Sequence, residues 1–255
     1  MFTYCVSHFS NILTLVVTLF LITNPTCFCL NLKLVNTSAY NGFSQGVATW
    51  YGEPRGVGST DDVAAPPYNG MISAGNNFLF KSGAGCGNCY QVKCTGNPEC
   101  SGNPVSVTIT DECPGCSDPV HFDLSGKAIG ALAKPGQDDK LRSLGKINIQ
   151  YQRIRCSYST SITFKIDEGS TPNYMSFAIE YVNGDGDIGA VQISSPSSKG
   201  WLNMQRVWGV TWKVNLSNGV NGPFSVKVTT IESKVTYIAN NVIPANWQPG
   251  QHYHG

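Results

Sequence analysis

Charged side chains are scarce in this sequence. Asp, Glu, Lys and Arg make up 13% of the 255 residues, and the formal net charge at pH 7 is only +1. Surfaces that bind nucleic acid or anionic membranes need a clear excess of Lys and Arg, so neither is expected as a partner. Aromatic residues reach 11%. With so little charge, this aromatic content favours a neutral partner, and polysaccharide is the obvious neutral polymer because its sugar faces stack on aromatic rings.

No membrane span is predicted. The apolar run at 12–22 is shorter than the about 20 residues that a spanning helix needs. It is typical of a secretory leader, although no Lys or Arg precedes it, so residues 1–29 are predicted to be a signal peptide cleaved near Cys29. The mature chain is then expected to be extracellular. Asn36 and Asn215 lie in Asn-x-Ser/Thr sequons, a pattern common by chance, and become candidate glycosylation sites.

Cysteine is absent after Cys156. Seven cysteines follow the predicted leader: Cys86, Cys89, Cys94, Cys100, Cys113, Cys116 and Cys156. Two pairs among them have the Cys-x-x-Cys spacing of zinc or redox motifs. Secretion into an oxidising compartment favours disulfides over both, so no metal and no cofactor are expected. The cross-linked domain is predicted to end near Cys156.

Helical patterns are nearly absent as well. Residues 123–133 form the single predicted helix, with Ser125 or Asp123 as its cap and Pro135 beyond its end. Short strands are predicted at 47–52, 79–80, 90–94, 105–110 and 147–151. Many strands with one helix predict a small β-barrel over residues 36–157.

Residues 160–255 show strand patterns only. These patterns lie at 162–166, 175–181, 190–193, 206–214, 224–231 and 235–238, between Gly, Asn and Pro turns, which predicts a β-sandwich. The acidic segment 183–187 faintly resembles a calcium loop. Ile188 stands where such a loop needs Gly, and no Glu closes it, so a hairpin turn is expected instead. The predicted fold class is all-β.

The stretch 105–123 carries the candidate acid chemistry. Alternation over 105–110 predicts a strand that delivers Asp111 to its end, and a Pro- and Gly-rich loop then leads to His121 and Asp123 on one face. Three titratable groups brought together could supply the general acid that glycoside chemistry needs. Spacing alone also fits a structural reading, in which the two aspartates cap turns and the histidine is a hydrogen-bonded core residue.

Several short motifs together resemble one family. They are Thr49-Trp50-Tyr51-Gly52, Pro67-Tyr68-Asn69-Gly70, Gly85-Cys86-Gly87-Asn88-Cys89-Tyr90, Ser101-Gly102-Asn103-Pro104, His121-Phe122-Asp123-Leu124-Ser125-Gly126 and Val242-Ile243-Pro244-Ala245-Asn246-Trp247. The chain resembles the plant β-expansins of the group-1 grass-pollen-allergen type over almost its whole mature length. The resemblance implies a double-psi β-barrel similar to family-45 glycoside hydrolases, followed by an immunoglobulin-like sandwich that binds cellulose. It implies loosening of the cell wall without hydrolysis, by a protein expected to be a monomer.

The resemblance also implies residue roles. A sugar-binding strip would hold Trp50 and Tyr51 in the barrel and Tyr174, Tyr181 and Trp208 in the sandwich. Alternation within one strand over 206–214 would instead bury Trp208 together with Trp212. A bulge at Gly209 would turn Trp208 outward, and exposure is expected for Trp208 and Tyr174 more than for Tyr181.

Disulfides Cys89–Cys156 and Cys94–Cys100 are implied in the same way. The family's Gly-Gly-Ala-Cys-Gly segment is missing before Pro66, where the loop 61–66 is shortened, and with it goes the usual partner of Cys86. Cys86, Cys113 and Cys116 therefore remain an odd set with open pairing.

Two other functions stay open from the sequence. Glu53 follows the first-strand motif at the place of the catalytic base of family-45 hydrolases, so an inverting endoglucanase with Asp123 as acid is one alternative. Pro54 and the loop behind it could instead turn Glu53 toward solvent, and this reading is favoured. The other alternative is a carbohydrate-binding defence protein. The target could be cellulose, xylan, mixed-linkage glucan or xyloglucan.

Overall fold

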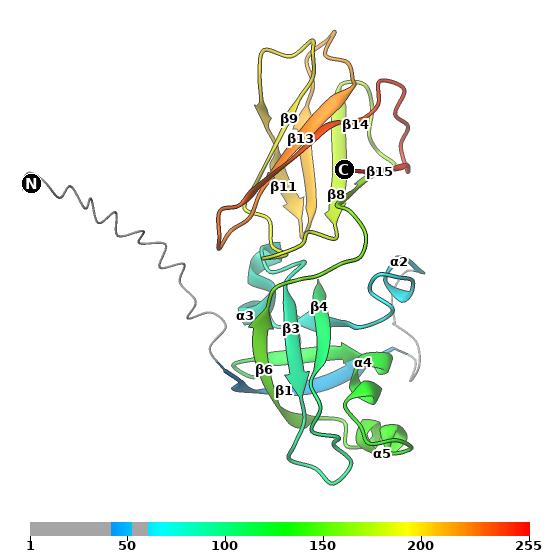
Figure 1. The fold of residues 1–255 in the computed structure, drawn as a ribbon, viewed down its shortest axis with the longest axis vertical. Helices are drawn as coiled ribbons and strands as arrows, with labels where there is room; N and C mark the ends of the chain where they lie inside the picture. Colours follow the sequence, from blue (N-terminus) through cyan, green and yellow to red (C-terminus); the bar gives the residue numbers. More distant parts are fainter. Residues whose placement is uncertain (1–41, 53–60) are drawn as a thin grey trace, which may run out of the picture. The chain divides into compact units, whose positions relative to one another are not determined.

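A six-stranded barrel occupies the first part of the chain. The computed structural model describes residues 42–52 and 61–255 (Figure 1). The barrel strands, blue to green in Figure 1, are β1 Ser44–Tyr51, β2 Ile72–Gly75, β3 Cys89–Lys93, β4 Val105–Glu112, β5 His121–Ser125 and β6 Ile147–Ile154. They close in the order β1-β5-β2-β4-β3-β6. β1 and β5 are parallel, as are β2 and β4, while β5 pairs antiparallel with β2. The all-β prediction and the barrel are confirmed.

Alternation along the strands fills the barrel. Ala48 on β1, Ile109 on β4, and Phe122 and Leu124 on β5 are fully buried in one apolar cluster. Because successive side chains point to opposite faces, the residues between them lie on the other face of the sheet. On β5, Asp123 lies between Phe122 and Leu124, so its side chain points to that other face, and it is only half buried.

Helices in the barrel differ from the prediction. The helix expected at 123–133 is α4, Gly126–Ala131, and Asp123 belongs to β5 because both neighbouring strands pair with its backbone. Ser125 is the cap, since its Oγ accepts a hydrogen bond from the backbone N–H of Ala128 at 3.0 Å. Leu79 and Phe80, expected in a strand, belong to the short helix α3, Asn77–Phe80. Further short elements are α2 Asp61–Ala64, η2 Lys81–Gly83 and α5 Asp138–Ser143.

The second part is the predicted sandwich of two sheets. Its strands, yellow-green to red in Figure 1, are β7 Thr163–Ile166, β8 Tyr174–Glu180, β9 Ala190–Ser194, β10 Leu202–Asn203, β11 Gln205–Trp208, β12 Thr211–Asn215, β13 Phe224–Thr229, β14 Thr236–Ile243 and β15 His252–His254. One sheet has the order β10-β9-β13-β14 and the other β11-β12-β8-β7-β15. Phe164, Phe177 and Phe224 are among the side chains buried between them.

The strand expected at 206–214 is two strands. β11 and β12 form a hairpin, in which Trp208 pairs with Thr211 and Arg206 pairs with Trp212. Gly209 has φ +50° and lies in the turn, and the irregularity in the ladder falls between Arg206 and Trp208 instead of at Gly209. The alternation that linked Trp208 to Trp212 is therefore wrong, because the two residues lie on different strands.

The hairpin turn expected at 183–187 is also wrong, because β8 and β9 belong to different sheets. This loop instead packs against the barrel. Arg153 Nη2 on β6 donates hydrogen bonds to the Asn88 side chain at 2.6 Å and to the carbonyl of Asp185, and it lies 3.7 Å from Asp187 Oδ2. A Cβ at Gly87 would meet the carbonyl oxygen of Gly186 at 2.4 Å, so this approach requires glycine.

Three disulfides are present among the described cysteines. Cys89–Cys156 and Cys94–Cys100 confirm the pairing that the resemblance implied. Cys113 pairs with Cys116, which answers the open question about the odd set. Cys86 is the free cysteine of the described part, and it is buried. Burial, with a smaller contribution from the charge of Asp111, raises the pKa of the Cys86 thiol to about 12.

The buried thiol gives the first prediction. At pH 8 a pKa of about 12 leaves only about 10⁻⁴ of Cys86 as the reactive thiolate. We expect the mature protein, cleaved near Cys29, to take up no thiol reagent while folded and one equivalent after unfolding in denaturant. Nonreducing peptide mapping should place that label on Cys86. Labelling of Cys113 or Cys116, or stoichiometric zinc in the purified protein, would contradict the disulfide assignment.

Candidate functional site

Four residues line up across four adjacent barrel strands. Thr49 on β1 is the cross-strand partner of Asp123 on β5. Asp123 in turn pairs with Ala74 on β2, and Ala74 pairs with Asp111 on β4. Residues directly opposite each other on neighbouring strands share a face of the sheet. The two aspartates therefore stand on one face, with only the small side chain of Ala74 between them.

A bulge in β4 brings Asp111 into this row. β2 and β4 pair as Ser73 with Ile109 and then Ala74 with Asp111, so Thr110 is an extra residue on β4. Without the bulge, Asp111 would share the face of the buried Ile109, which points into the barrel. The sequence predicted that the strand would deliver Asp111 to its end, but alternation alone does not show which face it takes.

A hydrogen-bonded chain holds Asp123 from one side. Thr49 Oγ1 donates to Asp123 Oδ1 at 2.5 Å and lies 2.9 Å from Nε2 of His121. Since the Thr49 hydroxyl hydrogen goes to Asp123, its oxygen is left to accept from the Nε2–H of His121. Nδ1 of His121 lies 3.0 Å from Asp118 Oδ2, and Lys146 Nζ binds the same carboxylate at 2.7 Å.

His121 is the buried member of this chain, and its role at the site stays a prediction. Its side chain is buried, at 7% of full exposure, whereas Asp123 is half buried and Asp111 is exposed. Charge-assisted hydrogen bonding by Lys146, and to a lesser extent His121, lowers the pKa of Asp118. Thr49, Asp118 and Lys146 were not anticipated from the sequence. The shared parity of Thr49 and Tyr51 on β1 was a usable signal for the first of them.

Tyr51 lies beside this row. It comes two residues after Thr49 on β1, and its side chain is therefore on the same face as Asp123. Burial raises the pKa of Tyr51 to about 12, and the charges of Asp111 and Asp123 add to the increase. Tyr51 is therefore a hydrogen-bond donor at every physiological pH, next to two carboxylates that accept.

Trp50 lies between Thr49 and Tyr51 on β1, so its side chain points to the opposite face of the sheet. It packs against the barrel core, and its Nε1–H donates to the carbonyl of Arg142 in α5 at 3.0 Å. The guanidinium of Arg142 is fixed by Asp138 and Asp139, each at 2.8 Å. The structure thus brings Tyr51, Asp111, His121 and Asp123 together and leaves Trp50 on the other face, where a sugar-binding role stays a prediction.

The second candidate surface is the outer face of the β11-β12-β8 sheet. Trp212 is 5% exposed and faces the core, whereas Trp208 is 55% exposed. Tyr174 is the cross-strand partner of Asn215, and Thr211 is the partner of both Trp208 and Ala178, so Trp208 and Tyr174 share the outer face. Four residue steps along β12, from Thr211 to Asn215, separate the rows of Trp208 and Tyr174 by about 13 Å.

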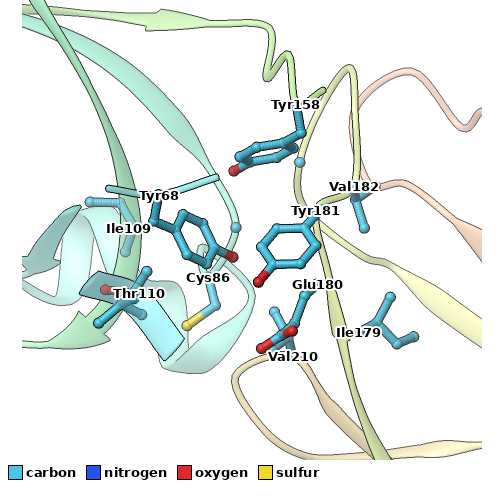
Figure 2. Close-up of a pocket in the computed structure, with 13 residues that line it drawn as sticks. Tyr68, Cys86, Ile109, Thr110, Tyr158, Ile179, Glu180, Tyr181, Val182 and Val210 are labelled. Atoms are coloured by element: carbon cyan, nitrogen blue, oxygen red, sulfur yellow. The ribbon is translucent and has the colours of Figure 1, made fainter. Parts of the chain in front are cut away.

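Tyr181 lies elsewhere. It follows the end of β8 with φ +61°, and its ring packs against Tyr68 at 5.2 Å and Tyr158 at 5.7 Å between centroids. Figure 2 shows these three rings around a pocket, with the sulfur of Cys86 and the carboxylate of Glu180 also at its wall. Burial raises the pKa of Tyr68 well above its ordinary value. Tyr181 is therefore not on the face that carries Trp208, and its predicted role in substrate binding stays untested.

Comparison with known proteins decides the family. Residues 162–244 match the expansin C-terminal domain, and residues 72–151 match a family described as lytic transglycolase. Expansin-B4 of Arabidopsis thaliana is 49% identical over 246 residues, which cover 92% of this chain and 93% of that protein. The chain belongs to the expansin-B family. The grass-pollen resemblance is confirmed by the pollen allergen Phl p 1 of Phleum pratense, 43% identical over 81% of this chain and 82% of its own.

Solved structures show the same fold. A crystal structure of a mutant Clavibacter michiganensis expansin in complex with cellohexaose has a TM-score of 0.63 and 23% identity to this expansin, and it covers 84% of this chain and 96% of the bacterial one. The apo form of the bacterial protein gives a TM-score of 0.62. These likenesses confirm the double-psi barrel followed by an immunoglobulin-like sandwich.

The remaining sequence predictions can be compared with the described residues. Cys113, Cys116 and Asp123 place possible metal-binding atoms within 4.8 Å of one another, but the two sulfurs are bonded to each other and cannot act as the thiolates that zinc needs. No helix in the described ranges is long and apolar enough to cross a membrane. The leader 1–29, the sequon at Asn36 and the candidate base Glu53 lie outside the described residues.

The contrast between the two tryptophans gives the second prediction. Trp212→Ala should lower the free energy of unfolding by about 3–5 kcal/mol, because it leaves a cavity in the sandwich core. Trp208→Ala should change it less, since the Trp208 ring is 55% exposed and its ring contact is with Phe80, at 5.1 Å between centroids. Denaturant unfolding of both variants measures the difference. Equal losses would mean that Trp208 is a core residue, as single-strand alternation suggested.

Proposed function

We propose that this expansin is a secreted, monomeric cell-wall protein that binds cellulose and matrix polysaccharide and loosens their non-covalent contacts without hydrolysis. The barrel, residues 36–157, would act at the junction between polymers, and the sandwich, residues 160–255, would hold cellulose. The observation that carries the proposal is the outer face of the sandwich, where Trp208 is exposed on the same side as Tyr174. The bacterial expansin of the same fold was crystallised with cellohexaose, which supports a glucan as the ligand.

The barrel row offers hydrogen bonds that can replace those between sugar chains. Thr49 occupies Oδ1 of Asp123, and Oδ2 accepts no hydrogen bond from the described residues, so it is left for a sugar hydroxyl. Tyr51 can donate to a ring or hydroxyl oxygen nearby. A glucan hydroxyl that exchanges its partner on another chain for Asp123 gives up an inter-chain bond without any covalent change. Binding alone therefore suffices for loosening.

An inverting endoglucanase is the competing function, and one observation favours it. Such an enzyme needs a second carboxylate about 6.5–9.5 Å from the acid. Asp111 stands in the row two strands from Asp123, or about 10 Å between backbones. From the sequence, Glu53 is the candidate base of this alternative, although a solvent-facing Glu53 is the favoured interpretation. Among the described residues no hydrogen bond holds Asp111 toward Asp123, because Asp111 Oδ1 accepts from the backbone N–H of Glu112, and this is why we favour binding over turnover.

The third prediction concerns the extension of a clamped, heat-inactivated wall strip by the protein and its variants. Asp123→Asn should abolish extension, because the amide offers one carbonyl oxygen where the carboxylate offers two acceptors. Glu53→Gln should leave extension largely intact. Asp139→Asn, a change at an 82% exposed side chain outside the row, is the matched control. The bath should contain no new reducing ends with any of the four proteins.

Accumulating oligosaccharides would reverse the conclusion. If the wild type releases soluble products and either Asp111→Asn or Glu53→Gln stops the release, the protein is an endoglucanase. If Asp123→Asn extends walls as well as the wild type, the barrel row has no part in loosening.

The fourth prediction concerns cellulose binding, measured as the amount of protein that pellets with microcrystalline cellulose. Trp208→Ala should weaken binding, since it removes the most exposed ring of the outer face. Trp201→Ala is the matched control, because Trp201 lies beside the other sheet with Lys227 Nζ 4.1 Å from its ring centre. Equal pelleting of both variants and the wild type would refute the sandwich as the cellulose-binding part.

A further inference from the structure

The sequon that starts at Asn215 begins on the proposed binding face. Asn215 is the last residue of β12, and its side chain is exposed. Its cross-strand partner on β8 is Tyr174. The sequence predicted glycosylation at Asn215 and sugar binding at Tyr174 as unrelated features, but the strand register makes these residues direct neighbours.

The two side chains share the outer face. On β12, Trp212 is buried in the sandwich core and Val214 packs against that core, so Lys213 and Asn215 point the other way. Directly opposed residues in an antiparallel pair have Cβ atoms about 4.5–5.5 Å apart. This separation is shorter than a single sugar ring with its linkage. A sugar on the Asn215 amide would therefore lie over the tyrosine ring or beside it.

A surface groove leads away from the same residue. Leu202, Asn203, Gln205, Lys213 and Val214 line it together with Asn215. Four of these six residues have amide or ammonium side chains, which can hydrogen-bond hydroxyl groups. The inner sugars of an attached glycan thus have a polar surface beside them, and the aromatic ring of Tyr174 on the other side.

We propose that an N-linked glycan on Asn215 covers Tyr174 and thereby restricts polysaccharide binding on the sandwich to the Trp208 end of the face. In the attachment step, Nδ2 of Asn215 forms a bond to C1 of the first sugar of a lipid-diphosphate-linked oligosaccharide, the amide loses one proton, and the lipid diphosphate leaves. The first sugar then occupies the ring face that a glucan would use. This inference rests on the proposed function, because it names a regulation of the same surface.

The fold tolerates removal of the sequon. Within Asn215-Leu216-Ser217 only Leu216 is buried, and its backbone N–H donates to the carbonyl of Asn173 at 2.9 Å. Asn215 and Ser217 are exposed. Asn215→Gln and Ser217→Ala should therefore both fold, and the second variant keeps the native asparagine while abolishing the modification.

The first test measures whether Tyr174 is covered. The protein is secreted from a eukaryotic host as wild type and as Ser217→Ala, and peptide mapping locates the glycan. Tetranitromethane should nitrate Tyr174 several-fold more slowly in the glycosylated protein, while nitration of Tyr253, which lies on β15 of the same sheet, should be equal in both. An unmodified Asn215 in the secreted protein, or equal nitration of Tyr174, would overturn the proposal.

The second test measures cellulose binding on both backgrounds. Without the glycan, Tyr174→Ala should weaken pelleting by about 3- to 10-fold, as expected for one lost aromatic contact. With the glycan, the same substitution should have no effect, and Trp208→Ala should weaken binding in both forms. A Tyr174→Ala effect of equal size on both backgrounds would contradict the inference. If Trp208→Ala and Tyr174→Ala are both silent without the glycan, the failure lies in the proposed function, and the nitration result stands apart from it.

Discussion

The position of β5 between β1 and β2 is the constraint on which the barrel site depends. Backbone pairing on both sides fixes Asp123 opposite Thr49 and Ala74, and alternation then buries Phe122 and Leu124. A slip of one residue would exchange the two faces, moving the carboxylate into the apolar core. The cost of burying that charge, and of exposing two large apolar side chains, holds the register and with it the site.

A second constraint is the row itself, which combines groups that no single segment could supply. Thr49, Asp123 and Asp111 come from three strands, and the small side chain of Ala74 stands between the two carboxylates in the register. His121 is buried, and its ring nitrogens contact Thr49 and Asp118. The titratable cluster expected from the sequence thus consists of the exposed Asp111, the half-buried Asp123 and the buried His121.

In the sandwich, the β11–β12 hairpin and the end of β8 separate the aromatic residues. Trp212 is buried in the core, Trp208 is 55% exposed with its ring packed against Phe80, and Tyr181 packs with Tyr68 and Tyr158. The outer face carries Trp208 and Tyr174. It also carries the sequon residue Asn215 beside Tyr174, so the proposed binding surface and the proposed glycan share one strip of sheet.

The sequence by itself determined the all-β class, the two-part organisation, the family and two disulfides, because alternation, turn residues and short motifs are local signals. Tertiary structure decided the rest. The β4 bulge that brings Asp111 to the outer face, the β11–β12 hairpin that separates Trp208 from Trp212, and the Cys113–Cys116 pairing all depend on which strands and loops meet. The register that joins Asn215 to Tyr174 has the same origin. Cross-strand register is set by the packing of whole sheets, so no local pattern in the chain contains it.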